Sequence, residues 1–439
     1  MKYGKPVGCT YESPRSGFAF LVRMSEVHAA LVFIATVALS VYLYKTSGLS
    51  VALGIVIPVG AGLTRYLGVG HTSASYVLNP RHDNMFAAAG RPVRAIVTGA
   101  TSGIGLETVK EFIRRGMHVT LAVRNADKAR STVAALAIEL ALSSKEVAAL
   151  VDIADLDVTK LASVRRFAQD YLARGCPLDV LVCNAGAMLS RPALVADAAP
   201  DRPVDVAFAT NALGHFLLVS LLFPLILRSA TRVVTLSSAI HLSAKPGPAG
   251  ETFNVTDARR WDPPAAYATG KLASLWLARA VQFRIDRALA RNSALGAPGG
   301  ARAAAMSVHP GTVWTPFHMP FYHDSPCGVY LIVPLLFGPL AYCAFKSAEE
   351  GARTTLHCAL AALPAAAPAA RDAHSAAVAA LGPAAAAQPG QLHMDARVCA
   401  MSAAAGDDEA AERFWAHCLW LLEHMGLNSK DCAHWDLIK

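Results

Sequence analysis

The pattern of hydrophobic and polar residues changes near Arg94. From there on, short runs rich in β-branched residues alternate with longer stretches whose apolar positions have helical spacing. This alternation is typical of βαβ units, in which helices cover both faces of a parallel sheet. It predicts an α/β domain with a doubly wound parallel sheet. The predicted strands are Ala95–Thr98, His118–Val123, Val151–Asp157, Val180–Cys183, Arg232–Leu236 and Ala304–Val308.

Two apolar runs precede this domain. Val27–Tyr44 contains no Lys, Arg, Asp or Glu and is long enough to cross a bilayer core of about 30 Å. A buried core helix is the alternative for this run. Thr46–Thr64 carries Pro58 and several glycines and is the weaker span. Basic residues flank the pair on both sides, which under the positive-inside rule predicts a hairpin with both ends in the cytosol. They are Lys2, Lys5, Arg15, Arg23, Arg65, Arg81, Arg91 and Arg94.

These patterns divide the chain into six segments. A polar segment (1–26) precedes a membrane anchor of one or two transmembrane helices (27–64) and a linker (65–93). The α/β domain spans 94–358, and an insertion dominated by Ala and Pro (359–389) predicts low-complexity surface. Residues 390–439 complete the domain, with an edge strand within Gly390–Asp395 and an amphipathic helix over Ala410–Met425.

Composition narrows the class of protein. The 439 residues are 54% hydrophobic, which fits a globular domain with a membrane anchor better than a polytopic transporter. The net charge is +8, but the basic residues are scattered rather than clustered with aromatics, so we expect no nucleic acid as a partner. The nine cysteines form no CxxC pair and no Cys/His metal spacing. This predicts reduced thiols in a reducing compartment and no metal site.

The first junction between strand and helix carries a phosphate-binding pattern. The stretch AIVTGATSGIGLETVKEF runs from a strand through a glycine-rich loop into a helix. Gly99, Gly103 and Gly105 stand where a backbone must turn tightly and approach a pyrophosphate, and the helix N-terminus offers free N–H groups. A structural turn without a ligand is the alternative. The pattern favours a Rossmann-type dinucleotide site.

A tyrosine stands one helical turn before a lysine in the stretch YATGK. The i, i+4 spacing of Tyr267 and Lys271 places both side chains on one face of a helix. Because a nearby ammonium favours the ionised form of a phenol, we expect Lys271 to lower the pKa of Tyr267. Taken alone, the spacing also fits a half-buried tyrosine beside a solvated lysine.

Six motifs in this order and at this approximate spacing resemble those of the short-chain dehydrogenase/reductase family. They are Gly-x-x-x-Gly-x-Gly from Gly99, NAG at Asn184–Gly186, NALGHF with Asn211, VTLSS with Ser238, YATGK, and HPGTVWT with Pro310, Gly311 and Thr315. The similarity covers about residues 94–360 and is greatest to the retinol-dehydrogenase-like branch. It implies a Rossmann-type fold and hydride transfer between a nicotinamide and a carbonyl or alcohol.

The resemblance implies a role for each matching residue. Tyr267 gives or takes the proton, and Lys271 lowers its pKa and holds the nicotinamide ribose. Ser238, with Ser237 as its neighbouring alternative, hydrogen-bonds the substrate oxygen, and Asn211 supports a water-linked proton relay. Taken alone, Asn211 could be an ordinary buried amide and Ser238 a strand end. The implied cofactor-binding residues are Gly99, Thr101, Ser102, Gly103, Ile104, Gly105, Arg124, Asp157, Asn184, Ala185, Gly186, Tyr267, Lys271, Pro310, Gly311, Val313 and Thr315.

The choice of cofactor depends on the end of the second strand. In TLAVRNADKA, Arg124 occupies the place where NAD-selective folds offer a carboxylate to the ribose hydroxyls. A guanidinium can pair with a 2′-phosphate, so we predict a preference for NADP(H). NAD(H) is the alternative if Arg124 is only a solvated strand-end residue. In the family pattern, Asp157 matches the acid near the adenine amino group, and Thr315 matches a residue near the nicotinamide carboxamide.

An apolar segment between Pro316 and Lys346 lies where the family has its substrate lid. Such a segment could cover a lipophilic substrate, lie on a membrane surface, or do both. We therefore expect a membrane-anchored oxidoreductase for a lipophilic alcohol and its aldehyde or ketone, of retinoid, steroid or lipid type. Its location would be the endoplasmic reticulum or another intracellular membrane, with the catalytic domain facing the cytosol; homo-oligomerisation stays open. The alternative is a catalytically silent family member that acts as a membrane-bound scaffold or cofactor-sensing module.

Overall fold

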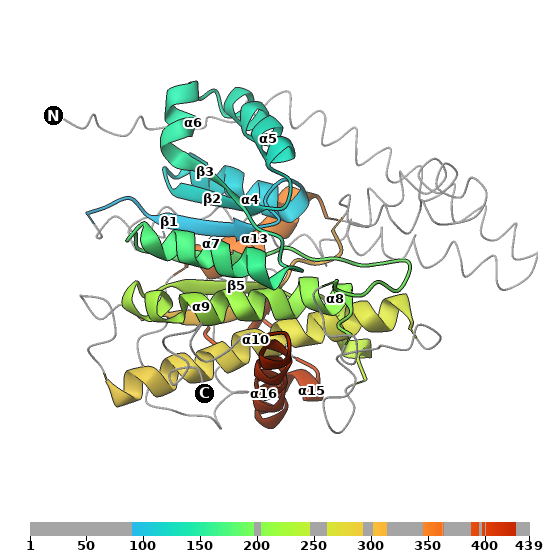
Figure 1. Cartoon of the computed structure of the whole chain (residues 1–439). Helices are drawn as coiled ribbons and strands as arrows, with labels where there is room; N and C mark the ends of the chain where they lie inside the picture. Colours follow the sequence, from blue (N-terminus) through green and yellow to red (C-terminus); the bar gives the residue numbers. More distant parts are fainter. Residues whose placement is uncertain are drawn as a thin grey trace, which may run out of the picture. The chain divides into compact units, whose positions relative to one another are not determined.

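A sheet of eight strands lies at the centre of the part of the chain that the computed structural model describes (Figure 1). The described residues are 90–196, 203–245, 261–292, 302–313, 346–361, 363, 388–394, 397–399 and 401–426. The predicted membrane anchor, the predicted lid, Thr315 and most of the Ala/Pro-rich insertion lie outside them. The strand order is β3-β2-β1-β4-β5-β6-β7-β8. All neighbours are parallel except β7 and β8, which are antiparallel.

The strands that lie deepest in the sheet are largely apolar, because helices bury both of their faces. In β5 and β6 every residue is buried. The chain builds one half of the sheet through β1, β2 and β3 and then returns to the other side of β1 with β4. This reversal puts the topological switch point, where open α/β sheets bind ligands, at the carboxyl ends of β1 and β4. The strands are β1 (Arg94–Thr98), β2 (His118–Val123), β3 (Val151–Asp155), β4 (Val180–Cys183), β5 (Arg232–Leu236), β6 (Ala304–His309), β7 (Leu392–Met394) and β8 (Arg397–Val398).

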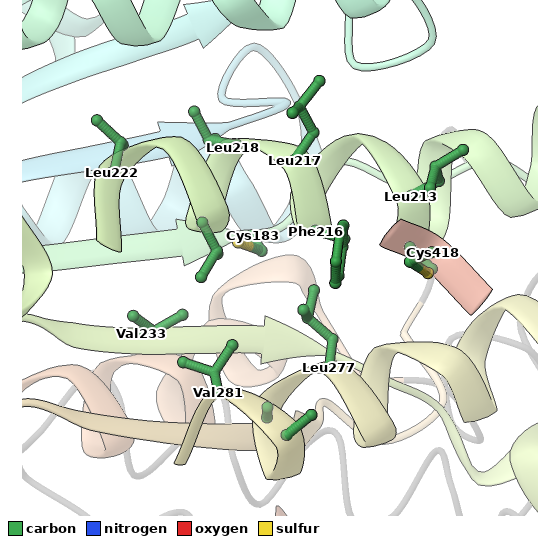
Figure 2. Packing of buried hydrophobic residues seen from close by; sticks show 14 of the residues in the cluster. Cys183, Leu213, Phe216, Leu217, Leu218, Leu222, Val233, Leu277, Val281 and Cys418 are labelled. Atoms are coloured by element: carbon green, nitrogen blue, oxygen red, sulfur yellow. The ribbon is translucent and has the colours of Figure 1, made fainter. Parts of the chain in front are cut away.

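Two hydrophobic clusters lie on opposite faces of this sheet. One joins the sheet to α7, α9, α10 and α16, and the other joins it to α4, α5 and α13. Figure 2 shows part of the first cluster: Phe216 of α9 points toward Leu277 of α10, while Leu217 and Leu222 leave the opposite side of α9. The helices are α4 (Gly103–Arg114), α5 (Ala126–Glu139), α6 (Ser144–Leu150), α7 (Leu161–Ala173), α8 (Val206–Phe208), the π-helical turn η2 (Ala209–Leu213), α9 (Gly214–Arg228), the 3-10 turn η3 (Ala239–Ser243), α10 (Pro263–Arg291), α13 (Ala348–Leu360), α15 (Ala403–Gly406) and α16 (Asp408–His424).

The most apolar of the described helices belongs to the core. The continuous stretch Val206–Arg228, made of α8, η2 and α9, is long and apolar enough to cross a membrane by length and composition. However, 89% of its most apolar window is buried inside the domain. Its side chains pack against the central strands instead (Figure 2).

The predicted doubly wound parallel sheet is confirmed, and its six predicted strands from β1 to β6 match to within two residues. The largest difference is β3, which ends at Asp155 rather than at Asp157. The Asp157 carboxylate accepts hydrogen bonds from the backbone and the hydroxyl of Thr159, which turns the chain out of the sheet. β7 lies within the predicted Gly390–Asp395 but is not the edge strand, because the unpredicted β8 pairs with it. The predicted C-terminal helix is also present, as α16.

Candidate active site

The glycine-rich turn between β1 and α4 is built to approach an anionic ligand closely. Gly99 and Gly103 have positive φ angles of 65° and 56°, which favour glycine. A Cβ on Gly105 would lie 2.4 Å from Asn184 Nδ2 and 2.6 Å from Gly99 O, so a larger side chain does not fit. Within the described residues, Ser102 does not cap α4 with its side chain. The first N–H groups of α4 therefore remain available to a phosphate.

The NAG motif ties the end of β4 to this turn. Asn184 Nδ2 donates to Thr98 O at 2.8 Å and to Gly99 O at 3.2 Å. The backbone N–H groups of Asn184 and Ala185 both donate to Thr98 Oγ1, each at 2.9 Å. Backbone and side chain together thus fix the turn against the central sheet. The tether gives the motif a structural role in addition to the cofactor-binding role that the resemblance implies.

The end of β2 presents a free basic side chain. Arg124 follows β2 directly and is exposed, and it forms no ion pair with any residue in the described ranges. The next residue, Asn125, instead caps α5 by accepting a hydrogen bond from Lys128 N at 2.9 Å. Asp157, after β3, commits its Oδ1 to Thr159. Of these polar groups, only Arg124 is uncommitted and cationic, as a 2′-phosphate requires.

The residues predicted after β6 also reach the carboxyl edge of the sheet. Gly311 has a positive φ of 85°, and its N–H donates to His309 Nδ1 at 3.4 Å. Val313 forms a parallel β-bridge with Lys346, which leads into α13. Pro310 is buried where β6 ends. These residues therefore lie at the carboxyl end of β6, on the same edge of the sheet as the glycine-rich turn after β1.

The residues predicted to be catalytic come from three elements. Ser238 follows β5 and caps η3, Tyr267 and Lys271 lie in the first turns of α10, and Asn211 lies in the π-helical turn η2. Lys271 Nζ lies 5.5 Å from the centre of the Tyr267 ring. The Tyr267 hydroxyl shares a side-chain hydrogen bond with Ser238. The fold therefore brings the serine, the tyrosine and the lysine together.

The two adjacent serines have different environments. Ser237 is buried, and its hydroxyl donates to Lys271 O at 2.7 Å, so this group helps to fix α10 on β5. Ser238 instead bonds the Tyr267 hydroxyl. Of the two, Ser238 is thus the one placed to share a substrate oxygen with the tyrosine.

Burial dominates the ionisation of Tyr267 and Lys271. It raises the pKa of the Tyr267 phenol above its ordinary value, and the hydrogen bond with Ser238 only partly opposes this shift. Burial also lowers the pKa of Lys271 to about 8. The expectation that the phenol pKa lies below its ordinary value is therefore wrong, because desolvation is the largest influence and exceeds the opposing hydrogen bond with Ser238. At neutral pH this site holds a protonated phenol, which is ready to donate.

Asn211 points its free oxygen toward Lys271. Its Nδ2 donates to Ala187 O at 2.7 Å and to Ala207 O at 2.8 Å, which fixes the orientation of the amide. Its Oδ1 is buried and accepts no hydrogen bond from any described residue. A Cβ on Gly186 would lie 3.0 Å from this Oδ1 and 3.3 Å from Lys271 Nζ. Asn211 Oδ1 and Lys271 Nζ thus both lie beside Gly186, and an unpaired acceptor near an ammonium suits a bridging water or ligand hydroxyl.

Sequence reasoning missed two residues at this site. Thr98 ends β1 and binds the NAG backbone, and His215 lies one helical turn after Asn211, with its Nε2 2.9 Å from Thr98 Oγ1. The signal that could have found His215 was its i, i+4 spacing from Asn211 within NALGHF, the same spacing that singled out Tyr267 and Lys271.

Comparison with known proteins points to the same family as the sequence motifs. The family model described as short chain dehydrogenase matches residues 94–249. Retinol dehydrogenase 12 of Mus musculus is 35% identical over 269 residues, which are 61% of this chain and 72% of that protein. Polyprenol dehydrogenase of Homo sapiens is 33% identical over 279 residues, 62% of this chain and 73% of that protein. A crystal structure of an uncharacterised protein from Mycobacterium paratuberculosis is 27% identical, has a TM-score of 0.50, and matches 76% of this chain and 97% of its own.

The chain therefore belongs to the short-chain dehydrogenase/reductase family, as an NAD(P)-dependent enzyme that acts on CH–OH groups. Within this family it falls in the retinol-dehydrogenase-like branch.

Proposed function

We propose that this protein is a membrane-anchored, NADP(H)-dependent oxidoreductase that interconverts a lipophilic alcohol and its aldehyde or ketone. The observation that carries the proposal is the convergence of Ser238, Tyr267 and Lys271 with the unpaired Oδ1 of Asn211. A partly buried serine and tyrosine and a buried lysine can each serve the packing of the domain alone. A buried amide oxygen without a partner beside a buried ammonium has no such structural purpose.

The predicted catalytic residues pass a proton from one group to the next during reduction of the carbonyl. A bound nicotinamide supplies the hydride for reduction of the carbonyl carbon. The protonated phenol of Tyr267 donates its proton to the carbonyl oxygen, while Ser238 hydrogen-bonds that oxygen. The Lys271 ammonium stabilises the phenolate that remains and supplies a replacement proton. The space beside Gly186, with Asn211 Oδ1 as acceptor, would hold the water or hydroxyl that returns a proton to Lys271.

The glycine-rich turn supports a dinucleotide at this site, with the residues that line it in the roles predicted from the sequence. Gly99, Gly103 and Gly105 allow a pyrophosphate to approach the N-terminus of α4. The exposed guanidinium of Arg124 favours NADP(H), because it can pair with a 2′-phosphate and the end of β2 offers no carboxylate in its place. The remaining predicted contacts come from Thr101, Ser102, Ile104, Asp157, Asn184, Ala185, Gly186, Pro310, Gly311, Val313 and Thr315, the last of which lies outside the described residues.

Exposed apolar side chains on the segments that follow β5 and β4 support a lipophilic substrate. Leu242 of η3, four residues after Ser238, is 63% exposed, and Leu194, after β4, is 51% exposed. These follow the carboxyl ends of β5 and β4, where ligands bind in open α/β sheets. The relatives named for retinol and polyprenol act, by those names, on alcohols of this kind. We extend that substrate class to this chain.

Membrane attachment rests on the two apolar runs within residues 27–64. We propose that they hold the enzyme on the endoplasmic reticulum or another intracellular membrane, with the catalytic domain in the cytosol. Removal of Met1–Thr64 should move the enzyme into the soluble fraction while its affinity for NADPH stays the same. Retention of the shortened chain on membranes would place the attachment elsewhere in the chain.

The experiment that tests the proposed function uses the purified full chain in detergent. NADPH or NADH is supplied with retinal and a panel of other lipophilic aldehydes and ketones, and both cofactor loss and alcohol formation are followed. We expect alcohol to form in step with cofactor oxidation, with a higher kcat/KM for NADPH. Tight NADPH binding without any turnover over the panel would instead favour a silent cofactor-sensing protein.

A further inference from the structure

A buried histidine connects the cofactor turn to the catalytic asparagine. His215 is the second residue of α9 and lies four residues after Asn211, and only 1% of its surface is exposed. Its Nε2 lies 2.9 Å from the Oγ1 of Thr98. Thr98 ends β1 next to Gly99, so this contact joins two segments that are 117 residues apart in the sequence.

The hydrogen bonds around Thr98 determine which nitrogen of His215 carries the proton. Thr98 Oγ1 accepts from the backbone N–H groups of Asn184 and Ala185 at 2.9 Å each, which occupies both lone pairs of the hydroxyl. Its own proton must therefore point elsewhere. His215 Nε2 at 2.9 Å is nearer than Val182 O at 3.4 Å. Nε2 is thus an acceptor, and the neutral ring carries its proton on Nδ1.

The other ring nitrogen of His215 faces the catalytic turn. The ring forms a hydrogen bond with the backbone of Asn211, the residue one turn earlier. With Nε2 accepting from Thr98, this bond is donated by Nδ1–H. The Asn211 carbonyl also accepts from Ser274 Oγ of α10 at 2.9 Å, three residues after Lys271. His215 and Ser274 thus hold one carbonyl from two sides.

The electrostatic environment keeps this arrangement neutral. Burial lowers the pKa of His215 to about 4, and the charge of Lys271 lowers it further, whereas the hydrogen bond to the Asn211 backbone acts in the opposite direction. A proton on Nε2 would place an N–H against a hydroxyl oxygen whose lone pairs are already used. Protonation of the His215 ring would also place a second positive charge near the Lys271 ammonium.

We propose that His215 is a positioning residue which, as the neutral Nδ1–H tautomer, holds the Thr98 hydroxyl and the Asn211 carbonyl in a fixed relation. The glycine-rich turn that receives the cofactor and the asparagine that faces Lys271 are then set by one side chain. This inference rests on the proposed function, because it assigns His215 to the same site. It goes beyond that function in naming the group that couples cofactor binding to proton transfer.

Three substitutions separate the two hydrogen bonds of His215. His215→Asn places an amide nitrogen near the position of Nδ1, so it keeps the bond to Asn211 and loses the bond to Thr98. His215→Gln places an amide oxygen near the position of Nε2 and does the reverse. His215→Phe retains a ring and loses both bonds. His393→Gln is the matched control, since His393 on β7 is also fully buried with a pKa lowered to about 4.

The measurements are the NADPH dissociation constant, kcat with retinal and the melting temperature, each on the full chain. We expect His215→Asn to weaken NADPH binding by about three- to tenfold and to keep kcat within about twofold, as one neutral hydrogen bond allows. His215→Gln should lower kcat by about three- to tenfold and keep the NADPH affinity. His215→Phe should show both losses, and His393→Gln should lower only the melting temperature.

Equal losses of affinity, kcat and melting temperature in all three variants would overturn the proposal, as would three variants that behave like the wild type. A ¹⁵N-histidine spectrum of the wild type supplies an independent readout. We expect His215 to remain the Nδ1–H tautomer from pH 8 to pH 5, and a proton on Nε2 in that range would refute the assignment. If the wild type reduces no carbonyl, the proposed function fails, whereas NADPH affinity and the spectrum still decide the role of His215.

Discussion

Replacement of Gly186 by alanine should separate catalysis from folding. The new methyl group would lie 3.0 Å from Asn211 Oδ1 and 3.3 Å from Lys271 Nζ, in the space that the two polar groups share. Both distances are shorter than ordinary van der Waals contact, so each group must move by a few tenths of an ångström. Gly186 is not among the glycines with positive φ, so alanine meets no backbone strain there.

The expected magnitudes follow from what the methyl group displaces. Overpacking costs about 1 to 3 kcal/mol, and the lower entropy of the unfolded alanine variant returns about 0.4 to 1 kcal/mol. The free energy of unfolding should therefore fall by only about 1 kcal/mol. Proton transfer by a positioned group is worth at least about 100-fold in rate. A methyl in place of the relay water or hydroxyl should thus lower kcat about 100-fold, which is about 2.7 kcal/mol in the barrier.

The assay compares kcat for retinal reduction, the NADPH dissociation constant and the melting temperature of Gly186→Ala with those of the wild type. Gly406→Ala is the control, because Gly406 also lacks a positive φ and a Cβ there would meet no atom within 4 Å. The control should match the wild type in all three measurements. A Gly186→Ala enzyme that keeps kcat within about threefold would show that the space beside Gly186 carries no part of the proton transfer.

Three further predictions concern the cofactor turn, the cofactor choice and the pH dependence. Gly105→Ala should lower the free energy of unfolding by about 2 to 4 kcal/mol, because its methyl would displace Asn184 Nδ2 from two hydrogen bonds and clash with the backbone oxygen of Gly99. Urea titrations test this, and an unchanged midpoint would refute it. Arg124→Asp should weaken NADPH binding about tenfold to hundredfold and leave NADH binding unchanged. The test is the ratio of kcat/KM for NADPH to kcat/KM for NADH, and a ratio that does not shift toward NADH would contradict the prediction. Lys271 has a pKa lowered to about 8, so its ammonium is present below that pH and lost above it. The kcat/KM for NADPH in carbonyl reduction should therefore fall as the pH rises through about 8, whereas a flat profile to pH 10 would contradict the role of the ammonium.

Much of the fold could be predicted from the sequence, because its determinants are local. The buried central strands are largely apolar, and the turn after β1 needs glycine at Gly99 and Gly103. The same holds for the pairing of Tyr267 with Lys271, since i, i+4 spacing on a helix fixes which side chains are neighbours.

Other features of the site depend on tertiary contacts and left no local signal. The direction of the Tyr267 pKa shift depends on how deeply the ring is buried, which no short motif reveals. The different roles of Ser237 and Ser238 arise from the packing of α10 on β5. The contact between Thr98 and His215 joins residues 117 positions apart, so it appears only once β1 and α9 are placed together.

The central claim is that Tyr267 is the proton donor of an NADP(H)-dependent reductase. It is tested most directly by Tyr267→Phe in the full chain, with NADPH binding and retinal reduction measured on the same preparation. The substitution removes one hydroxyl and leaves the ring over Lys271 in place. We predict an NADPH dissociation constant within about twofold of the wild type and a kcat lowered at least about 100-fold. A phenylalanine variant that keeps kcat within about tenfold of the wild type would contradict the assignment.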